Sequence, residues 1–168
     1  MPSHTTRPES GTIHSDPTTA QSDPTSHASE NPSEYPRRIL IAVTGLSPQI
    51  VTETLYALAV APAGTLFVPT EIHLITTRSG ADKARLALLS DNPGWFPRLC
   101  RDYALPPIAF DAANIHVLEG ADGQPLDDIR SPEDNRRAAD GITALIREFT
   151  ADPDCALHVS IAGGRKTM

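Results

Sequence analysis

Four largely apolar runs alternate with helix-forming segments from residue 37 onward, and this alternation limits the possible folds more than any other feature. The runs cover residues 38–43, 71–77, 114–118 and 156–161. Runs without strict alternation of polar and apolar residues are typical of strands covered on both faces, as in a parallel sheet. Because the connections carry helix signals and no hairpin signals, the sequence predicts an α/β domain with a parallel sheet and right-handed crossovers.

Hydroxyl side chains predict where helices begin when they precede a segment whose apolar residues recur at helical spacing. Ser47 and Ser131 each precede a proline, and acidic residues follow Ser131, where the helix dipole favours them. We expect Ser79 to cap the second helix, with Leu86 and Leu89 facing inward. Behind Ser131, one apolar stripe predicts a helix that packs on the sheet, formed by Ala138, Ile142, Leu145, Ile146 and Phe149.

The composition changes sharply near residue 36. Ser, Thr and Pro supply 19 of the first 36 residues, and a segment with so few large apolar side chains cannot offset its ordering entropy. We therefore expect a disordered tail at 1–36 and one domain at 37–168. No helix-forming segment follows the last run, so we expect the domain to be truncated at its C-terminus.

Charge and hydropathy exclude several functional classes. The tail carries one arginine and five acidic residues, and the remainder carries 13 basic and 16 acidic residues, which suits neither long DNA nor long RNA. No apolar run is long enough to span a bilayer, and no signal peptide is visible. Two distant cysteines match no disulfide framework or zinc spacing, so we expect a cytoplasmic protein.

Two loops at the predicted carboxyl edge of the sheet have an unusual composition. Residues 44–49 are small and hydroxyl-bearing, and residues 160–167 combine paired glycines with Arg165 and Lys166. A cation at the start of a helix is unfavourable by about 0.3–1 kcal/mol, because it is repelled by the positive end of the helix dipole. A phosphate bound between the helix and the cation would make the same position favourable. An ordinary turn and a solvated charged pair explain the second loop equally well. A plain N-cap is the simpler interpretation of Ser47 alone.

Other motifs are weaker. The second loop fails the P-loop pattern because Ser160 stands where the first glycine belongs, and no G-x-G-x-x-G follows the first run. Three strand histidines, His73, His116 and His158, lack the paired spacing of a metal site, so they are interpreted as packed side chains or as residues facing a ligand cleft. We expect no metal and no cofactor. Thr77 and Arg78 leave the second run at the same edge as the two loops.

The chain from Arg38 to Met168 resembles the CRISPR-associated Rossmann-fold (CARF) proteins, of the stand-alone group linked to ring nucleases. The resemblance depends on four segments: VTGLSPQIVTETLYAL, EIHLITTRSGADKA, PLDDIRSPEDNRRAAD and the terminal HVSIAGGRKTM. It implies a Rossmann-like parallel sheet with helices on both faces. It also implies a homodimer that binds cyclic oligoadenylate, with the ring lying across the dimer axis over the two loops.

The resemblance further implies how the ring would be cleaved. Lys166 and Ser47 correspond to the catalytic positions of ring nucleases, which cleave the ring, here cyclic tetra-adenylate, by metal-independent attack of a 2′-hydroxyl and so switch off type III CRISPR antiviral signalling. The alternatives are a CARF sensor that controls an effector nuclease without cleaving the ring, and an unrelated nucleotide-binding α/β protein. The candidate ligand-binding residues are Thr44, Gly45, Gln49, Thr77, Arg78, Gly163, Gly164, Arg165 and Thr167.

Overall fold

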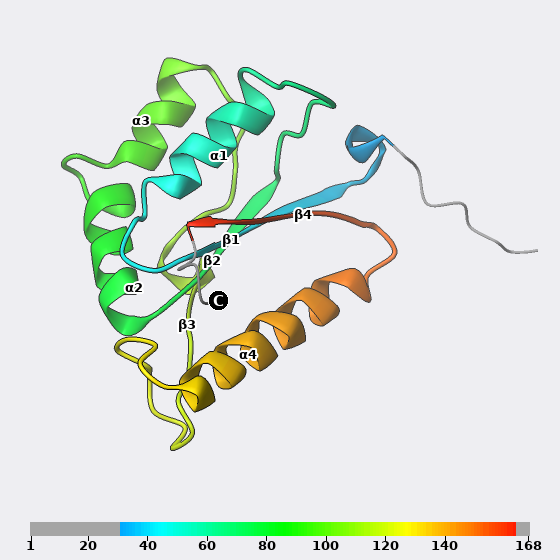
Figure 1. Cartoon of the computed structure of the whole chain (residues 1–168). Coiled ribbons are helices and arrows are strands. Elements are labelled where there is room, and N and C mark those ends of the chain that lie inside the picture. The colour runs from blue at the N-terminus through cyan, green and yellow to red at the C-terminus, as the bar shows by residue number, and fades with distance from the viewer. Residues whose placement is uncertain (1–30, 164–168) are drawn as a thin grey trace, which may run out of the picture.

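A four-stranded, fully parallel sheet forms the centre of the protein (Figure 1). The structure is a computed structural model, and it describes residues 31–163. The strand order is β3-β2-β1-β4, which confirms the predicted Rossmann-like sheet with helices on both faces. The strands are β1 (Arg37–Thr44), β2 (Glu71–Thr76), β3 (Ile115–Val117) and β4 (Cys155–Gly163).

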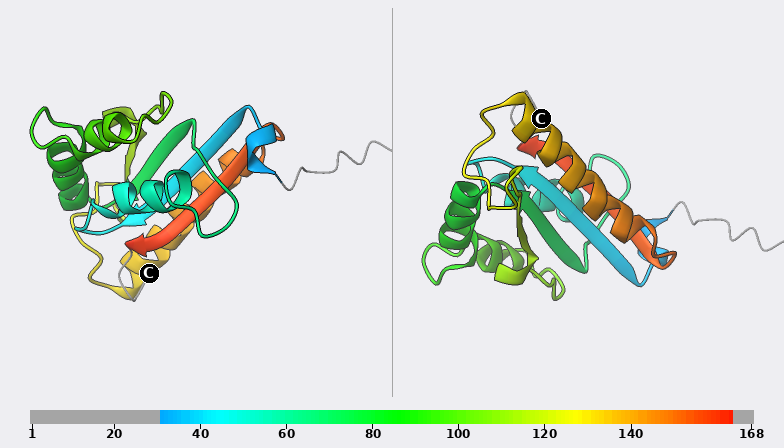
Figure 2. Two further views of the ribbon diagram at one scale, coloured as in Figure 1. Left: turned by 90° about the horizontal axis from the view of Figure 1, so that it is seen from above. Right: turned by 90° about the horizontal axis from the view of Figure 1, so that it is seen from below.

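Helices cover the sheet on both faces, as the upper and lower views in Figure 2 show. One face carries α1 (Ile50–Ala59), α2 (Arg78–Ala84) with its π-helical continuation η2 (Arg85–Leu89), and α3 (Trp95–Asp102). The other carries α4 (Pro132–Thr150). Two single-turn 3-10 helices, η1 (Pro32–Glu34) and η3 (Ala112–Asn114), complete the described elements. No helix in the described part of the chain is both long and apolar enough to cross a membrane.

The apolar strand β1 supplies the core of both layers. Its even-numbered residues Leu40 and Ala42 belong to the cluster under α1, α2 and α3, whereas Ile39, Ile41 and Val43 belong to the cluster under α4. Successive strand side chains point to opposite faces, so a central strand between two helical layers must be apolar at every position. This explains why the first apolar run shows no polar alternation.

The helices change faces between β1 and β4. The chain leaves β1 through α1 on one face and enters β4 from α4 on the other. Neighbouring strands whose connections diverge in this way leave a crevice at their carboxyl ends, where open α/β sheets bind ligands. The two ends stay side by side, because Thr44 pairs with Gly163 after a shift of register that follows the pair Ala42 and Ser160.

Three predictions about the first two helices are wrong. Helix α1 begins at Ile50 after Gln49, because the carbonyl of Ser47 accepts hydrogen bonds from Ile50 N and Thr44 Oγ1 and closes a turn first. The N-cap of α2 is Thr77, whose hydroxyl accepts from Gly80 N, and not Ser79. A helix that begins there turns Leu86 outward, leaving it 67% exposed, whereas Leu89 is partly buried against the core as predicted. The fully buried side chains of this segment are those of Ala81, Ala84 and Leu88.

Helix α4 begins where the sequence predicts. Ser131 Oγ accepts from Asp134 N at 3.0 Å, and Asp134 Oδ2 accepts from Ser131 N at 3.0 Å, so each residue satisfies an amide that the helix leaves unpaired. Ala138 and Phe149 are buried in the predicted stripe, and Ile142, Leu145 and Ile146 pack against the same cluster.

Replacing Ser131 with alanine is expected to lower the free energy of unfolding by about 1 kcal/mol, because the N-cap acceptor is lost. Urea unfolding of the two proteins measures the change. Thr143→Ala is the matched control: its hydroxyl bonds only to the carbonyl of Ala139 within the same helix. Alanine is the better helix former there, so no loss is expected. An equal loss in both variants would contradict the role of the cap.

Candidate functional site

The ends of β1 and β4 form one edge, and the predicted site residues lie around it. Thr44 closes β1 and pairs with Gly163, the last described residue of β4. Gly45, Ser47 and Gln49 follow in the loop before α1. Gly164, Arg165, Lys166 and Thr167, which continue from Gly163, lie outside the described residues. Both predicted loops therefore begin at neighbouring strand ends.

Hydrogen bonds hold the loop after β1 against the rest of the sheet. Thr44 is fully buried and its Oγ1 donates to the carbonyl of Ser47 at 3.0 Å. Thr76, at the end of β2, is also buried, and its Oγ1 donates to the carbonyl of Gly45 at 3.0 Å. The loop conformation is thus fixed from both its own strand and the neighbouring one.

A close helix approach reinforces this arrangement. A Cβ atom built on Gly80 would lie 2.0 Å from Thr76 Oγ1 and 2.3 Å from the carbonyl oxygen of Gly45. Only glycine allows α2 to lie this close to the loop. The sequence already placed Thr76 at this edge, together with Thr77 and Arg78, but it gave Gly80 no role, although a glycine early in the following helix was a visible signal.

The hydroxyl of Ser47 is available to a ligand. Ser47 is exposed, its carbonyl is used inside the loop, and no described residue hydrogen-bonds its hydroxyl. Gln49 is likewise exposed, and its side chain does not cap α1. The neighbouring Pro48 is buried, so it anchors the loop while the side chains on either side face outward.

Thr77 and Arg78 reach the same sheet edge but are tied to other groups. Thr77 is buried, and its hydroxyl caps α2. Arg78 N donates to the carbonyl of Leu126 at 2.9 Å, and its Nε lies 3.4 Å from Asp127 Oδ1. These contacts hold the loop before α4 against the start of α2.

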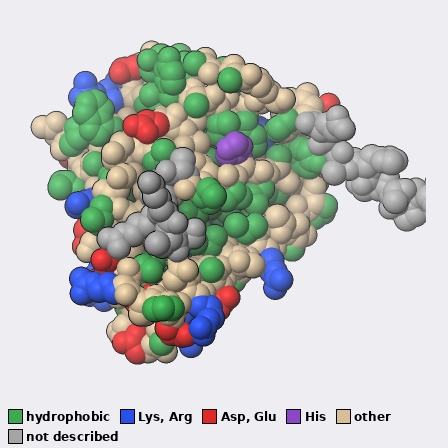
Figure 3. Space-filling model, in the orientation of Figure 1, with side chains coloured by type: hydrophobic (Ala, Val, Ile, Leu, Met, Phe, Trp, Pro, Cys, Tyr) green, Lys and Arg blue, Asp and Glu red, His purple; other side chains and the backbone are tan. Residues whose placement is uncertain are grey.

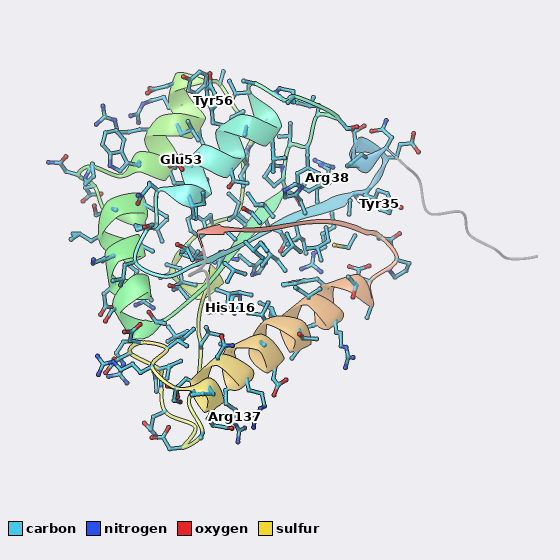
Figure 4. All side chains as sticks on the ribbon, in the orientation of Figure 1. Tyr35, Arg38, Glu53, Tyr56, His116 and Arg137 are labelled. Carbon is cyan, nitrogen blue, oxygen red and sulfur yellow. The ribbon has the colours of Figure 1, made fainter. Side chains whose placement is uncertain are left out.

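A contact between two hydroxyl groups connects α1 to β4. Thr54 Oγ1 lies 3.3 Å from Ser160 Oγ, across the gap between the helix and the edge strand. This contact links the first half of α1 to the strand that leads to the second loop. Figure 4 shows Glu53 on α1, in the same part of the helix.

The histidines do not converge on a metal. His73 and His116 pair on β2 and β3, whereas His158 lies against Phe67 with ring centroids 5.6 Å apart. Within residues 31–163, no group of side chains could hold a metal ion. Burial lowers the pKa of His158. Burial also raises the pKa of the Cys100 and Cys155 thiols, which disfavours reactive thiolates at both positions.

A comparison with known protein families gives one match. The sequence model of the family described as CRISPR-associated protein NE0113 matches residues 47–168, a range that includes Ser47, the elements from α1 to β4 and residues 164–168. No curated protein and no solved structure was found to match the chain.

Proposed function

Because the chain belongs to the family of CRISPR-associated protein NE0113, we propose that it is a CRISPR-associated ring nuclease. It binds a cyclic oligoadenylate, of which cyclic tetra-adenylate is the proposed form, and cleaves the ring without a metal. Two copies of the chain share one ring across a two-fold axis. Cleavage removes the messenger and switches off type III CRISPR antiviral signalling.

The observation that carries this proposal is the register of Thr44 with Gly163 at the point where the helices change faces. It brings the start of the glycine-rich loop beside the loop of Ser47. Backbone amides and an exposed hydroxyl at a strand–helix junction suit a phosphodiester. Lys166 follows Gly163 by three residues in the sequence and supplies the cation.

An apolar strip along β4 supports association with a second copy. Hydrophobic side chains gather along this edge strand in Figure 3. Ile161 is 72% exposed, and Leu157 and Val159 on the same face are only partly buried. Apolar side chains gathered on an exposed strand edge are typical of surfaces that another protein segment covers.

The reaction needs alignment and charge stabilisation. The 2′-hydroxyl of one ribose attacks the adjacent phosphorus, so that an O2′–P bond forms and the P–O5′ bond breaks. The 2′-hydroxyl loses its proton to solvent and the departing 5′-oxygen gains one, which leaves a 2′,3′-cyclic phosphate and a 5′-hydroxyl. Lys166 stabilises the charge on the phosphoryl oxygens, and Ser47 positions the phosphate or the 2′-hydroxyl.

One observation favours a second candidate function. Neither 44–49 nor 160–167 contains a histidine or a carboxylate that could act as a general base. In this second function the same two loops hold the ring intact, and the protein is a CARF sensor that controls an effector nuclease.

Incubating the full chain with cyclic tetra-adenylate in the presence of EDTA, followed by chromatography, tests the proposal. We expect linear di-adenylate that ends in a 2′,3′-cyclic phosphate. ATP, NAD and linear tetra-adenylate serve as controls and are expected to bind at least tenfold more weakly. Selective binding of a ring that stays intact would support the sensor. Equal binding of ATP or NAD and the ring, or no binding, would overturn both functions.

A further inference from the structure

A cavity of about 650 Å³ lies beside the edge strand β3, on the face covered by α4. Its lining comes from β3, from the loop after it and from one side of α4, and includes none of the site residues in 44–49 or 160–167. Figure 4 shows His116 between the sheet and α4, and Arg137 in the N-terminal half of that helix. This cavity is therefore a separate site from the one proposed for the ring.

A series of polar contacts leads to His116 from Arg37 and Glu71, the first residues of β1 and β2. Arg37 binds Glu71 through two hydrogen bonds, one of them from Nη2 to Oε2 at 3.1 Å. These bonds hold the pKa of Glu71 below its ordinary value, so the group is a carboxylate and can only accept. His73 Nε2 lies 3.2 Å from Glu71 Oε2, and His73 Nδ1 lies 2.9 Å from His116 Nε2.

The carboxylate determines where the protons sit in the neutral pair. His73 Nε2 must carry a hydrogen to donate to Glu71, so His73 Nδ1 is an acceptor. His116 Nε2 must then carry the hydrogen that this acceptor receives. His116 Nδ1 is left with a lone pair, and no described residue donates to it. His116 lines the cavity, so it offers the cavity a hydrogen-bond acceptor whose position is set by Glu71 through His73.

A proton added anywhere in the pair destroys this acceptor. If His73 becomes charged, its Nδ1 donates to His116 Nε2, and the hydrogen of His116 moves to Nδ1. If His116 becomes charged, Nδ1 also carries a hydrogen. Burial and the neighbouring His73 lower the pKa of His116, which favours the neutral form of its ring.

The charged groups around the cavity are mainly acidic. Glu119 follows β3, and Asp140 and Glu148 lie on α4. Arg137 is the basic residue in the lining, and its Nε is already engaged by Glu133 Oε1 at 3.3 Å. An acceptor ring beside three carboxylates favours a cation that carries N–H donors.

The remaining lining is apolar or small. Gly141 and Ala144 leave space on the surface of α4, and the aliphatic side chains are those of Ile75, Val117, Leu118 and Leu145. Small polar groups on an apolar surface are typical of sites for small molecules. A short hydrocarbon chain between two charged ends matches this distribution.

We propose that the cavity binds a small alkyl diammonium ion, with one ammonium N–H donating to His116 Nδ1 and the acidic side chains balancing its charge. The apolar wall covers the hydrocarbon chain. Glu71 and His73 do not touch the ligand; they are positioning residues that keep the acceptor on the correct nitrogen of His116.

Isothermal titration of the full chain with 1,4-diaminobutane tests this proposal. The matched ligand is the same diamine with both nitrogens fully methylated, which keeps both charges and has no N–H. We expect measurable binding of the diamine and at least tenfold weaker binding of the methylated form. Equal affinity for the two, or no binding of the diamine at neutral pH, would overturn the proposal.

Variants of the protein test the role of each group. His116→Phe is expected to weaken binding about tenfold, and Glu148→Gln and Asp140→Asn several-fold each. Glu71→Gln is expected to weaken binding several-fold without touching the cavity, because an amide can also donate to His73. His158→Phe, on the other face of the sheet, is the control and is expected to leave the affinity unchanged. If His158→Phe weakened diamine binding as much as His116→Phe, the assignment of His116 as the ligand's hydrogen-bond acceptor would be overturned.

Acidification provides a test that needs no variant. Binding is expected to weaken as the pH falls through the pKa of His116, because a charged ring repels the cation and offers no acceptor. Charged side chains line the same cavity and His73 contacts this ring, so the nitrogen NMR signal of His116 Nδ1 should be followed in the same titration; the charged residues are Glu119, Arg137, Asp140 and Glu148. A signal that shows a bound hydrogen at neutral pH would contradict the proposed tautomer.

Discussion

Replacing Gly80 with alanine is expected to lower the free energy of unfolding by about 3 kcal/mol, the upper end of what overpacking costs. The added Cβ would lie 2.3 Å from the backbone carbonyl oxygen of Gly45 and 2.0 Å from Thr76 Oγ1. Rotating the threonine side chain relieves only the second contact and breaks its hydrogen bond to Gly45. The backbone of α2 or of the loop must therefore move.

The same substitution is expected to weaken ligand binding at the loop after β1. Gly45 lies two residues before Ser47, and its carbonyl is one of the points that hold the loop. A displaced loop would carry the Ser47 hydroxyl away from the end of β4. Urea unfolding measures the stability, and titration with cyclic tetra-adenylate measures binding in the population that remains folded.

Gly64→Ala is the matched control, because a Cβ built on Gly64 meets no atom within 4 Å. It is expected to change neither stability nor binding by a measurable amount. If Gly80→Ala were as stable as Gly64→Ala, the close approach of α2 to the loop would be wrong.

Replacing Lys166 with alanine is expected to slow ring cleavage by about 10²- to 10³-fold, since this is the usual effect of removing one group that stabilises a developing oxyanion. Single-turnover assays with cyclic tetra-adenylate measure the rate of the chemical step. Binding is expected to weaken less than the rate, because the charge on the phosphoryl group is greatest in the transition state.

Lys83 provides an unusually clean control, because it is the other lysine of the chain. It is exposed and lies in the last turn of α2. Lys83→Ala is expected to retain the full cleavage rate, and Ser47→Ala an intermediate one. A cleavage rate that survives Lys166→Ala unchanged would exclude the proposed chemistry, whereas cleavage by none of the proteins would leave only the sensor function.

Capping residues in the sequence predicted the start of a helix correctly where no neighbouring residue competed for the same hydrogen bonds. The serine, proline and acidic residues at 131–134 begin α4 as expected, because their capping partners lie within four residues. The same type of signal failed at Ser47 and Ser79. At Ser47 the carbonyl accepts from Ile50 N and from Thr44 Oγ1, which closes a turn before the helix begins. At Ser79 the earlier Thr77 accepts the amide of Gly80.

Sequence alone determined the order of strands and helices, because each apolar run and each capping residue acts over a few neighbouring positions. Which strands pair, and which groups therefore meet, is decided by contacts between distant residues. Thr44 with Gly163, Gly80 with Gly45, and His73 with His116 are separated by 119, 35 and 43 positions in the numbering. No local sequence pattern specifies contacts over such separations, because these residues meet only when the layers pack and bring one strand beside another.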